Sequence, residues 1–476
     1  MIRDSVHCAY KHRGVEQLVA RRAHNPKVAG SSPVPTTKQK PVLIRGTGFS
    51  RFPRWGSRSS WFPPAFLPAR FFPFIITSLI IALFLVPGSL IQWARAEAGE
   101  RLLSGIDSLE VTGCSDLKGL RVGLITNAAA RTKSGEQGYR MMLRQGVLLR
   151  YLLSPEHGFA LDVEAGEKAG GAVLSGSLPV HSLYGASRRP DPSLLREVDI
   201  LVFDLQDVGV RCYTYISTMK YAMEACSEAG ISFMVLDRPN PISPLGRGGF
   251  MLEPASTSFV GSLDVPFLHA MTVGEIALFI KKRYCPDLSL RVVKMSGWDR
   301  GRFGDQFPGY SFRSPSPNIR SVDGAILYPA TVFLEATNVS EGRGTGHPFM
   351  QFGAPFIDGE QLALRLNLYA LPGVRFKAVR FVPNSSKFKG ERCGGVRLQV
   401  TDRDVFDPFM TASVILSLLH NRYPQELGID RQRTFFDRLA GTPRFREMIT
   451  SGMTPRDIVA ESRREAEGFR PLLLYP

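Results

Sequence analysis

The stretch VDILVFDLQD, residues 198–207, is an almost unbroken run of apolar side chains that ends on polar ones. Three similar runs of strand length lie in the N-terminal half, at 121–127, 148–155 and 232–239. Segments with apolar residues at helical spacing lie between the runs, at 136–146, 192–198 and 214–230. Near-continuous hydrophobic strands that alternate with amphipathic helices are typical of a parallel sheet covered on both faces. We therefore predict a Rossmann-like α/β domain.

The C-terminal half is predicted to form a smaller α/β domain. Residues 374–383 and 394–402 alternate apolar and polar side chains, as strands with one wet face do. Residues 358–370 and 407–424 have the apolar spacing of helices. Two strands and two helices in this order can bury a core of their own, so this half is not a tail.

Four segments follow from the changes in composition along the chain. The sequence RSPSPNIRS, rich in Ser and Pro, separates a Rossmann-like domain at 97–315 from a C-terminal domain at 316–476. Residues 1–70 are rich in Pro, Ser and Arg without any sustained period, and resemble the spurious product of translating a transfer-RNA gene. The alternative is a genuine disordered basic arm. Residues 71–96 form a fourth, apolar segment.

The apolar segment has the features of a secretory signal peptide. It has a basic flank, about 15 apolar residues, and an Ala-Arg-Ala sequence that ends at Ala96. We expect cleavage after Ala96 and an exported protein, periplasmic or extracellular. The alternative is an uncleaved N-terminal anchor, which would be the chain's one contact with a membrane.

Charge and cysteine usage exclude several classes of protein. The chain has 476 residues, 44% of them hydrophobic and 21% charged, which is ordinary for a folded protein. Its net charge is +16, but residues 1–70 contribute +11 of this and leave only +5 for the remainder. We therefore expect no nucleic-acid partner. The six cysteines form no C-x-x-C pair, so neither a zinc ribbon nor a disulfide-dense scaffold is indicated.

Polar residues follow the predicted strands at the point where each strand ends. These residues are Asn127, Glu156, His157, Asp207 and Arg238. In an open parallel sheet the carboxyl ends of the strands meet along one edge, where ligands bind. The alternative for each residue is a helix cap, an ion pair with arginine or a structural hydrogen bond. We predict a polar rim at which some of these residues bind or react.

The segment DLQDVGVRCYTYIST, residues 204–218, adds Arg211, Tyr213 and Tyr215 to this rim. An aspartate, an arginine and two phenols can hydrogen-bond to and stack on a polyhydroxylated ligand, although the tyrosines could equally pack against the sheet. The segment lacks G-x-G-x-x-G, and no strand is followed by a phosphate-binding G-x-x-x-x-G-K-[ST] loop. We therefore predict no nucleotide cofactor.

A second informative stretch is AILYPATVFLEATNVSEGRGTGHPF, residues 325–349, in which an apolar run ends at Glu335. The following loop combines Asn338, Glu341 and Arg343 with three glycines. Glycines let the backbone approach a ligand, and a guanidinium can bind a carboxylate through two hydrogen bonds. The alternative is a flexible surface turn that carries an incidental Glu-Arg pair.

An ordered series of motifs resembles a known family, the bacterial exo-β-N-acetylmuramidases, long classified as a domain of unknown function. The motifs are SPEHGF (154–159), AGEK (165–168), LPVHSLYG (178–185), VFDLQDVGVRCYTYISTM (202–219), VLDRPNP (235–241), SFVG (258–261), HAMTVGEIA (269–277), PSPNI (315–319) and NVSEGRGT (338–345). The similarity extends over roughly 119–476. One departure is HAMT, where HGMT is more usual, so that Ala270 replaces a glycine.

The resemblance implies an enzyme that releases N-acetylmuramic acid from the non-reducing ends of peptidoglycan fragments. It also implies an active cleft between a Rossmann-like domain and a smaller α/β domain. The glutamate of the EHG motif, the family's leading catalytic candidate, corresponds to Glu156. An assisting tyrosine corresponds to Tyr213 or Tyr215. Peptidoglycan-derived saccharides are the implied partners, without a cofactor or metal.

The chemistry of the residues agrees with this assignment. Glycoside cleavage needs an acid to protonate the leaving oxygen and a second group to stabilise the oxocarbenium-like state. Glu156, behind an apolar strand, is the expected acid, and Asp207, Glu341 and Tyr213 are candidates for the second role. Muramic acid carries a lactyl carboxylate, for which we expect a cation. The candidate cations are Arg211, Arg343 and Arg238.

Two other classes of function remain open. A non-catalytic cell-wall sugar-binding protein would keep the cleft and its arginines but tolerate the loss of Glu156. A metal-dependent hydrolase would use His157, Asp162 and His181, although these residues do not form an H-E-x-x-H motif. We favour the exported glycosidase.

Overall fold

The protein is described here by a computed structural model. The structure describes residues 101–164, 167, 172–174, 178–185 and 187–475, which all belong to one compact unit. The predicted leader, the predicted signal segment and most of the AGEK motif lie outside the described residues. Among the described helices, none has both the length and the apolarity needed to cross a bilayer.

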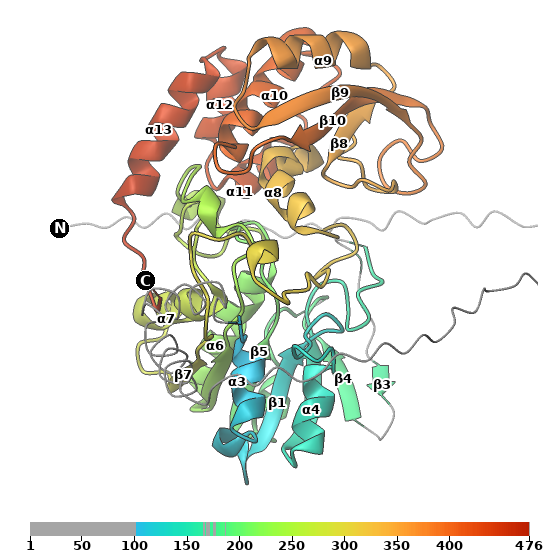
Figure 1. Cartoon of the computed structure of the whole chain (residues 1–476). Helices are drawn as coiled ribbons and strands as arrows, with labels where there is room; N and C mark the ends of the chain where they lie inside the picture. Colours follow the sequence, from blue (N-terminus) through green and yellow to red (C-terminus); the bar gives the residue numbers. More distant parts are fainter. Residues whose placement is uncertain (1–100, 165–166, 168–171, 175–177, 186, 476) are drawn as a thin grey trace, which may run out of the picture. The chain divides into compact units, whose positions relative to one another are not determined.

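A seven-stranded sheet forms the N-terminal lobe (Figure 1), and its strand order is β3-β4-β2-β1-β5-β6-β7. The strands are β1 (Arg121–Thr126), β2 (Leu148–Ser154), β3 (Ala172–Leu174), β4 (Leu178–Ser182), β5 (Ile200–Asp204), β6 (Ser232–Leu236) and β7 (Leu290–Val293). Six strands are parallel, and β3 is an antiparallel edge. The parallel strands have the Rossmann order, which reverses between β1 and β5. The predicted fold class is confirmed.

The side chains of β5 show why its sequence is continuously hydrophobic. Ile200 and Val202 belong to a buried cluster with helices α3 and α4, whereas Leu201 and Phe203 belong to a second cluster on the opposite face with α6. Both faces of the strand are therefore covered, and its side chains do not alternate between buried and exposed positions. The helices of this lobe are α3 (Gly105–Val111), α4 (Gly138–Arg144), α5 (Pro192–Leu195), α6 (Tyr215–Ala229) and α7 (Val273–Tyr284).

The C-terminal lobe has a small antiparallel sheet of order β8-β10-β9. Its strands are β8 (Gln351–Ala354), β9 (Val374–Phe381) and β10 (Cys393–Val400). Its helices are α8 (Val322–Thr331), α9 (Gly359–Leu368), α10 (Pro408–Arg422), α11 (Arg433–Ala440), α12 (Arg444–Thr450) and α13 (Pro455–Gly468). Asp358 and Asp407 cap α9 and α10 through backbone N–H groups, which fixes where these two predicted helices begin.

Short 3-10 helices complete the described elements. They are η1 (Ser115–Leu117), η2 (Ser243–Leu245), η3 (Pro254–Ser256), η4 (Gly304–Gln306) and η5 (Val332–Ala336). The apolar run that ends at Glu335 is thus helix α8 continued by η5.

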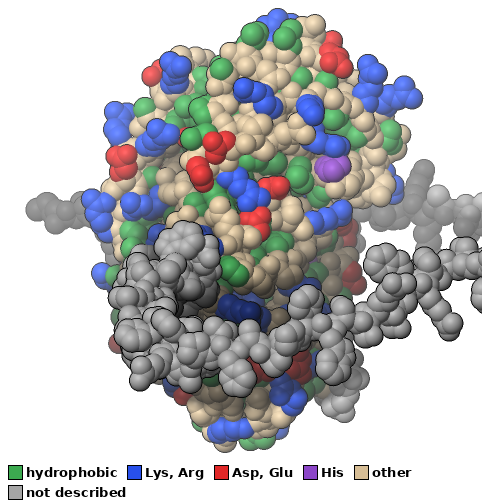
Figure 2. Space-filling view, viewed as in Figure 1, with side chains coloured by type: hydrophobic (Ala, Val, Ile, Leu, Met, Phe, Trp, Pro, Cys, Tyr) green, Lys and Arg blue, Asp and Glu red, His purple; other side chains and the backbone are tan. Residues whose placement is uncertain are grey.

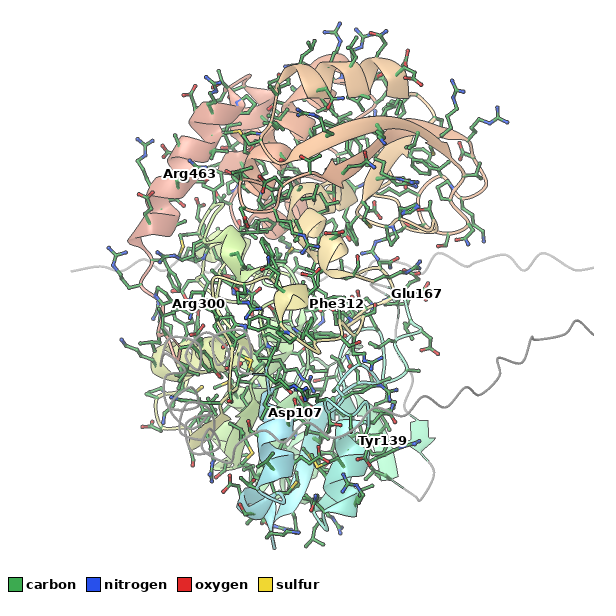
Figure 3. All side chains as sticks on the ribbon, in the orientation of Figure 1. Asp107, Tyr139, Glu167, Arg300, Phe312 and Arg463 are labelled. Atoms are coloured by element: carbon green, nitrogen blue, oxygen red, sulfur yellow. The ribbon has the colours of Figure 1, made fainter. Side chains whose placement is uncertain are left out.

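Aromatic side chains join the two lobes into one core. Phe267 of the N-terminal half lies 4.7 Å from Phe333 between ring centroids, and Phe250 lies 5.9 Å from Phe409. One buried cluster accordingly extends from β1 to the end of α13. Side chains fill the layer between the lobes, where Figure 3 labels Arg300 and Phe312. A shared core of this kind holds a cleft between lobes at a fixed geometry.

Candidate active site

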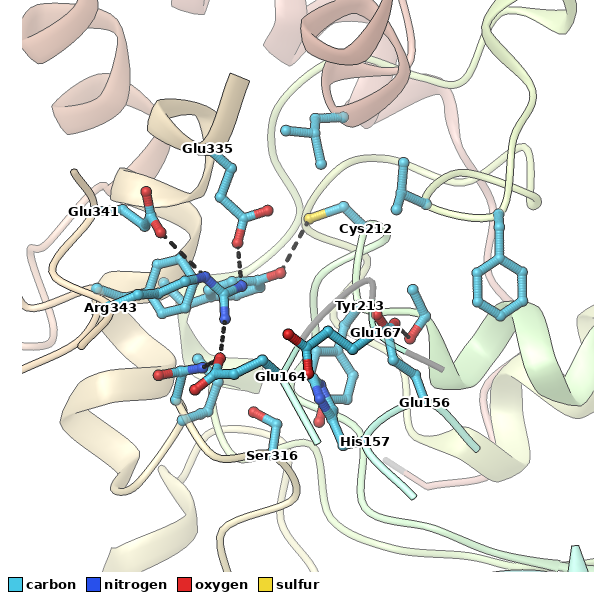
Figure 4. Close-up of a pocket in the computed structure, with 18 of the residues that line it drawn as sticks. Glu156, His157, Glu164, Glu167, Cys212, Tyr213, Ser316, Glu335, Glu341 and Arg343 are labelled. Carbon is cyan, nitrogen blue, oxygen red and sulfur yellow. Dashed lines mark hydrogen bonds and ion pairs between the residues drawn. The ribbon is translucent and has the colours of Figure 1, made fainter. Parts of the chain in front are cut away.

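A cavity of about 600 Å³ is lined by residues from both lobes. This volume lies in the range of small-molecule sites and suits a single sugar with its substituents. Figure 4 shows the charged and aromatic side chains that converge on it. The N-terminal lobe contributes the ends of β2 and β4 and the turn before α6, and the C-terminal lobe contributes η5, α11 and the loops around Glu341 and Lys387.

A strained turn presents the first two site residues. Strand β2 ends at Ser154, and His157 and Gly158 then have positive φ angles of 72° and 73°. Left-handed backbone is uncommon for a histidine and tends to be kept at functional sites. The turn places Glu156 and His157 on the cavity wall, each with only 6% of its surface exposed.

The ring of His157 has a defined tautomer. Its Nδ1 lies 2.9 Å from the carbonyl oxygen of Val163. Because a carbonyl only accepts, Nδ1 carries the proton, and Nε2 of the neutral ring is an acceptor. Burial lowers the pKa of His157, against the opposing influence of Glu156. The neutral imidazole can therefore accept a hydrogen bond from a sugar hydroxyl.

Thr214 and two tyrosines surround Glu156. The hydroxyl of Thr214 donates to Oε2 of Glu156 at 2.6 Å, and the hydroxyl of Tyr215 lies 3.4 Å from the Glu156 carbonyl oxygen. Burial, together with the neighbouring Glu156 carboxylate, raises the pKa of Tyr184 to about 12. The carboxyl group is thus oriented by side chains from the ends of two other segments.

Tyr213 contributes a buried phenol to the cavity. Its ring packs edge-on against Tyr215 at 4.8 Å and against Tyr328 at 6.4 Å. Its hydroxyl makes no close hydrogen bond to any residue that the structure describes, although the hydroxyls of Tyr215 and Ser316 lie near enough to affect its pKa. Burial raises the pKa of Tyr213 well above its ordinary value, so the hydroxyl keeps its proton. A buried donor without a partner in a cavity wall is suited to a ligand.

Arg343 is the centre of a charge network on the opposite wall (Figure 4). Its guanidinium pairs with Glu335, with Glu341 at 3.1 Å and with Glu164 at 3.7 Å. Lys387 neutralises Glu341 from the other side at 3.2 Å. Burial raises the pKa of Glu335 even though Arg343 lowers it. The wall therefore offers several carboxylates whose charges are largely compensated.

The structure brings five of the predicted site residues to this cavity: Glu156, His157, Tyr213, Glu341 and Arg343. Two others lie directly behind the wall. Tyr215 donates to the carbonyl oxygen of Pro315 at 2.6 Å, and Asn127 donates to the Tyr215 hydroxyl at 3.1 Å. These two residues position the wall rather than form it.

The other four predicted residues have partners elsewhere. Asp207 accepts from the backbone N–H of Gly209 at 2.6 Å, and Asn338 is exposed and donates to the carbonyl oxygen of Glu426. Arg238 pairs with Asp204 at 2.7 Å and lines a separate, smaller cavity. Arg211 is fully buried and donates to the carbonyl oxygens of Phe250, Val265 and Ala440. We do not include these four in the proposed site.

Several lining residues were missed by the sequence reasoning. Tyr184, Phe259 and Asn318 lie in motifs that carry the family resemblance, so a signal for them was present. Arg188, Glu335, Lys387 and Arg438 lie outside those motifs, and the last three come from the C-terminal lobe, so that only the packing of the lobes brings them to the cavity. Within the described ranges, no three His, Cys, Asp or Glu side chains are arranged to hold a metal ion.

The fold and the site together define a two-lobed α/β protein with a sugar-sized, carboxylate-lined cavity. Residues 122–323 match the model of the N-terminal domain of the exo-beta-N-acetylmuramidase NamZ, and residues 326–474 match the model of its C-terminal domain. The chain therefore belongs to the NamZ exo-β-N-acetylmuramidase family, as the motifs indicated, and is a glycosidase.

Individual relatives agree with this assignment. The chain is 42% identical over 371 residues to the peptidoglycan beta-N-acetylmuramidase NamZ of Bacillus subtilis (strain 168), a match that covers 78% of this chain and 89% of the relative. A crystal structure of a DUF1343 family protein from Bacteroides fragilis NCTC 9343, at 1.65 Å resolution, has a TM-score of 0.71 and 34% identity, covering 79% and 99% of the two chains. A second such protein, solved at 1.30 Å, has a TM-score of 0.62 and 26% identity, covering 77% and 95%.

Proposed function

We propose that this glycosidase removes N-acetylmuramic acid from the non-reducing ends of peptidoglycan fragments. The observation that carries the proposal is that Glu156 and the buried phenol of Tyr213, which makes no close hydrogen bond in the described part of the chain, line the same cavity. Family membership supplies the substrate class, because the Bacillus subtilis relative is a peptidoglycan β-N-acetylmuramidase. A cavity of about 600 Å³ suits one terminal sugar better than the interior of a glycan chain.

Glu156 acts as the general acid in this proposal. The hydroxyl of Thr214, 2.6 Å from Oε2, orients the carboxyl group at the end of β2. Glu156 donates its proton to the glycosidic oxygen as the bond to the leaving sugar breaks, and so avoids release of an alkoxide. The burial of the residue protects this proton transfer from bulk water.

Tyr213 assists as a neutral hydrogen-bond donor. Since its pKa is raised well above the ordinary value, the phenol does not serve as a phenolate nucleophile near neutral pH. A buried donor without a close partner among the described residues can gain a full hydrogen bond when the substrate binds. Its hydrogen bond can therefore contribute to stabilising the reacting sugar.

Two arginines at the rim of the cavity are our candidates for binding the lactyl carboxylate. Arg188 and Arg438 line the cavity, are exposed, and make no ion pair with any described residue. The guanidinium of Arg188 lies 4.2 Å over the ring of Phe259 and 5.3 Å over that of Tyr184, which fixes its orientation. Arg343, by contrast, already faces three glutamates.

We also propose that the protein is exported, with residues 71–96 as signal peptide. The basic flank, apolar core and Ala-Arg-Ala sequence support this. Fractionation of cells that express the chain with a C-terminal tag tests the proposal. Export predicts a shortened chain outside the inner membrane, and a full-length chain in the cytoplasm would contradict it.

Hydrolysis of two matched chromogenic glycosides tests the function. The purified chain is incubated with the β-glycoside of N-acetylmuramic acid and with that of N-acetylglucosamine, and with purified glycan fragments that end in muramic acid. We expect release of free N-acetylmuramic acid from the fragments, and preference for the first glycoside. Cleavage in the middle of the fragments, or preference for the glucosamine glycoside, would contradict the proposal.

A further inference from the structure

The outer face of the small sheet carries an unusual arrangement of positive charge. Val374 and Phe376 of β9 point into the core, whereas Arg375 and Lys377 are exposed on the other face. In the antiparallel register Lys377 lies directly opposite Arg397 of β10. Directly opposed residues share a face, and like charges in such a pair destabilise a sheet. The arrangement therefore costs stability in the absence of an anion.

No described carboxylate relieves this repulsion. Arg375, Lys377 and Arg397 form no ion pair with any residue in the described part of the chain, and the same holds for Arg380, Lys389 and Arg392 nearby. Arg397 instead donates to Oε1 of Gln351, at 2.7 and 3.2 Å. Basic side chains gather over the region of β9 and β10 in Figure 2. Their charges remain available to an anion from outside.

Protection of a sheet edge accounts for only part of this charge. A lysine on an exposed edge strand blocks pairing with other chains, and β9 is such an edge. However, Arg397 lies on β10, the central strand, which has no free edge. Its position opposite Lys377 is therefore better explained by a bound anion than by edge protection.

Two loops connect this outer face, here called the basic face (Arg375, Lys377 and Arg397), to the cavity. Gln351, the partner of Arg397, donates to the hydroxyl of Thr345 at 3.1 Å. Thr345 lies in the glycine-rich loop that carries Arg343. The connection between β9 and β10 places Lys387 in the wall of the same cavity. An extended ligand that leaves the cavity beside these loops reaches the sheet.

We propose that the outer face of the β8-β10-β9 sheet binds the anionic glycan strand that continues beyond the sugar held in the cavity. This rests on the proposed function, because an enzyme that removes terminal sugars holds one sugar and leaves the rest of the strand outside. In a strand without stem peptides each further muramic acid carries a free carboxylate, so the strand presents repeated negative charge. Cations two residues apart along β9 are spaced roughly 7 Å apart and can follow such a chain.

The test compares a short and a long substrate. The double variant Arg375→Gln/Lys377→Gln and the native protein are assayed on the muramic acid glycoside and on glycan strands of several disaccharide repeats with free carboxylates. The control, Arg150→Gln/Lys282→Gln, removes from the N-terminal lobe two exposed cations that form no ion pair with any residue the structure describes. Activity on the glycoside tests the proposed function. The ratio of kcat/KM on the long strands to kcat/KM on the glycoside tests whether the basic face binds the strand.

We expect the double variant to keep its kcat/KM on the glycoside and to lose about 10-fold on the long strands at low salt. Salt should reduce the preference of the native protein for long strands, and should have a smaller effect on the variant, which keeps fewer cations on this face. An undiminished preference in the double variant, or an equal loss in the control, would overturn the proposal.

Direct binding separates this proposal from the catalytic one. Calorimetry measures the affinity of the protein for the long strands, whether or not the protein cleaves the glycoside. We expect the double variant and the single variant Lys377→Gln to bind the long strands more weakly than the native protein does. A strand whose carboxylates are amidated should bind equally weakly to all three proteins. Binding of a polyphosphate in preference to the glycan strand would contradict a glycan occupant.

Discussion

At the scale of single residues, the hydroxyl of Tyr213 is predicted to contribute to activity but not to the stability of the fold. Its buried hydroxyl has no described hydrogen-bond partner, so Tyr213→Phe removes an unsatisfied group rather than a bond. We expect the free energy of unfolding to stay equal or rise by up to about 1 kcal/mol, while kcat falls roughly 10- to 100-fold. Urea unfolding and glycoside hydrolysis measure the two effects. A large loss of stability would show that the hydroxyl has a partner within the protein.

Arg188 is predicted to determine substrate choice. We expect Arg188→Ala to reduce kcat/KM on the muramic acid glycoside by roughly 10- to 100-fold, which corresponds to the loss of a charge-assisted hydrogen bond. The glucosamine glycoside lacks the carboxylate and should be affected little. Arg456→Ala, an exposed site on α13, is the control. Equal losses on both glycosides would exclude recognition of the carboxylate by Arg188.

Sequence reasoning located some site residues and missed others for a geometric reason. Glu156 and His157 follow β2, whose end faces the second lobe. The rule that ligands bind at the carboxyl ends of parallel strands therefore predicted them. Arg238 follows β6, on the other side of the reversal in strand order, where a separate cavity lies. Lys387 and Arg438 come from the C-terminal lobe and join the site only through the packing of the lobes. No local pattern could reveal that packing.

At the scale of elements, the strands with continuous apolar sequence were predictable and the shorter ones were not. β1, β2, β5 and β6 lie within the predicted ranges because both of their faces are buried. β4 was missed, since it contains Pro179 and is only partly buried. The C-terminal strands β9 and β10 were predicted from alternation, and their wet face is the basic face described above.

The opposed pair on that sheet gives a stability prediction. Lys377→Gln removes the repulsion with Arg397, so we expect the free energy of unfolding to rise by about 0.2 to 1 kcal/mol. Arg375→Gln is the matched control, because Arg375 faces the neutral Gln399. Urea unfolding at low salt measures both variants. A destabilised Lys377→Gln protein would mean that the lysine has a favourable partner.

At the scale of the whole molecule, the end of the chain is tied to the first lobe. The hydroxyl of Tyr475 donates to Asp237 at 2.6 Å, directly after β6, and the backbone N–H of Leu474 donates to Glu275 at 2.9 Å. Burial raises the pKa of Asp237 to about 6, although hydrogen bonds from Tyr475, Gly274 and Thr272 lower it. The contact between the C-terminal segment and the end of β6 is therefore sensitive to pH.

The sign of this dependence follows from linkage. A carboxyl whose pKa rises from 3.8 to about 6 on folding contributes stability that is complete below pH 4 and is lost as the pH rises through 6. Asp237→Asn cannot ionise, so the native protein should lose roughly 3 kcal/mol relative to the variant between pH 4 and 7. Urea unfolding of both proteins across this range tests the prediction. A constant difference would contradict it.

Apolar packing and the hydrogen bonds of Arg211 hold the two lobes together. The cavity depends on this contact, because residues of both lobes line it. The guanidinium of Arg211 bonds to backbone carbonyls of both halves, including that of Ala440 at the end of α11. The next three residues, Cys212, Tyr213 and Thr214, line the cavity. An arginine that looked like a ligand group in the sequence is thus placed to fix the wall that carries the reacting groups.

The role of Glu156 as general acid is tested most directly by varying the leaving group. The native protein, Glu156→Gln and the exposed control Glu197→Gln are assayed on muramic acid glycosides with a sugar and with a dinitrophenyl leaving group. We expect Glu156→Gln to lose roughly 10²- to 10⁴-fold in kcat on the sugar glycoside and far less on the dinitrophenyl glycoside, whose departure needs no proton. Full activity on the sugar glycoside, or equal losses on both, would contradict the assignment.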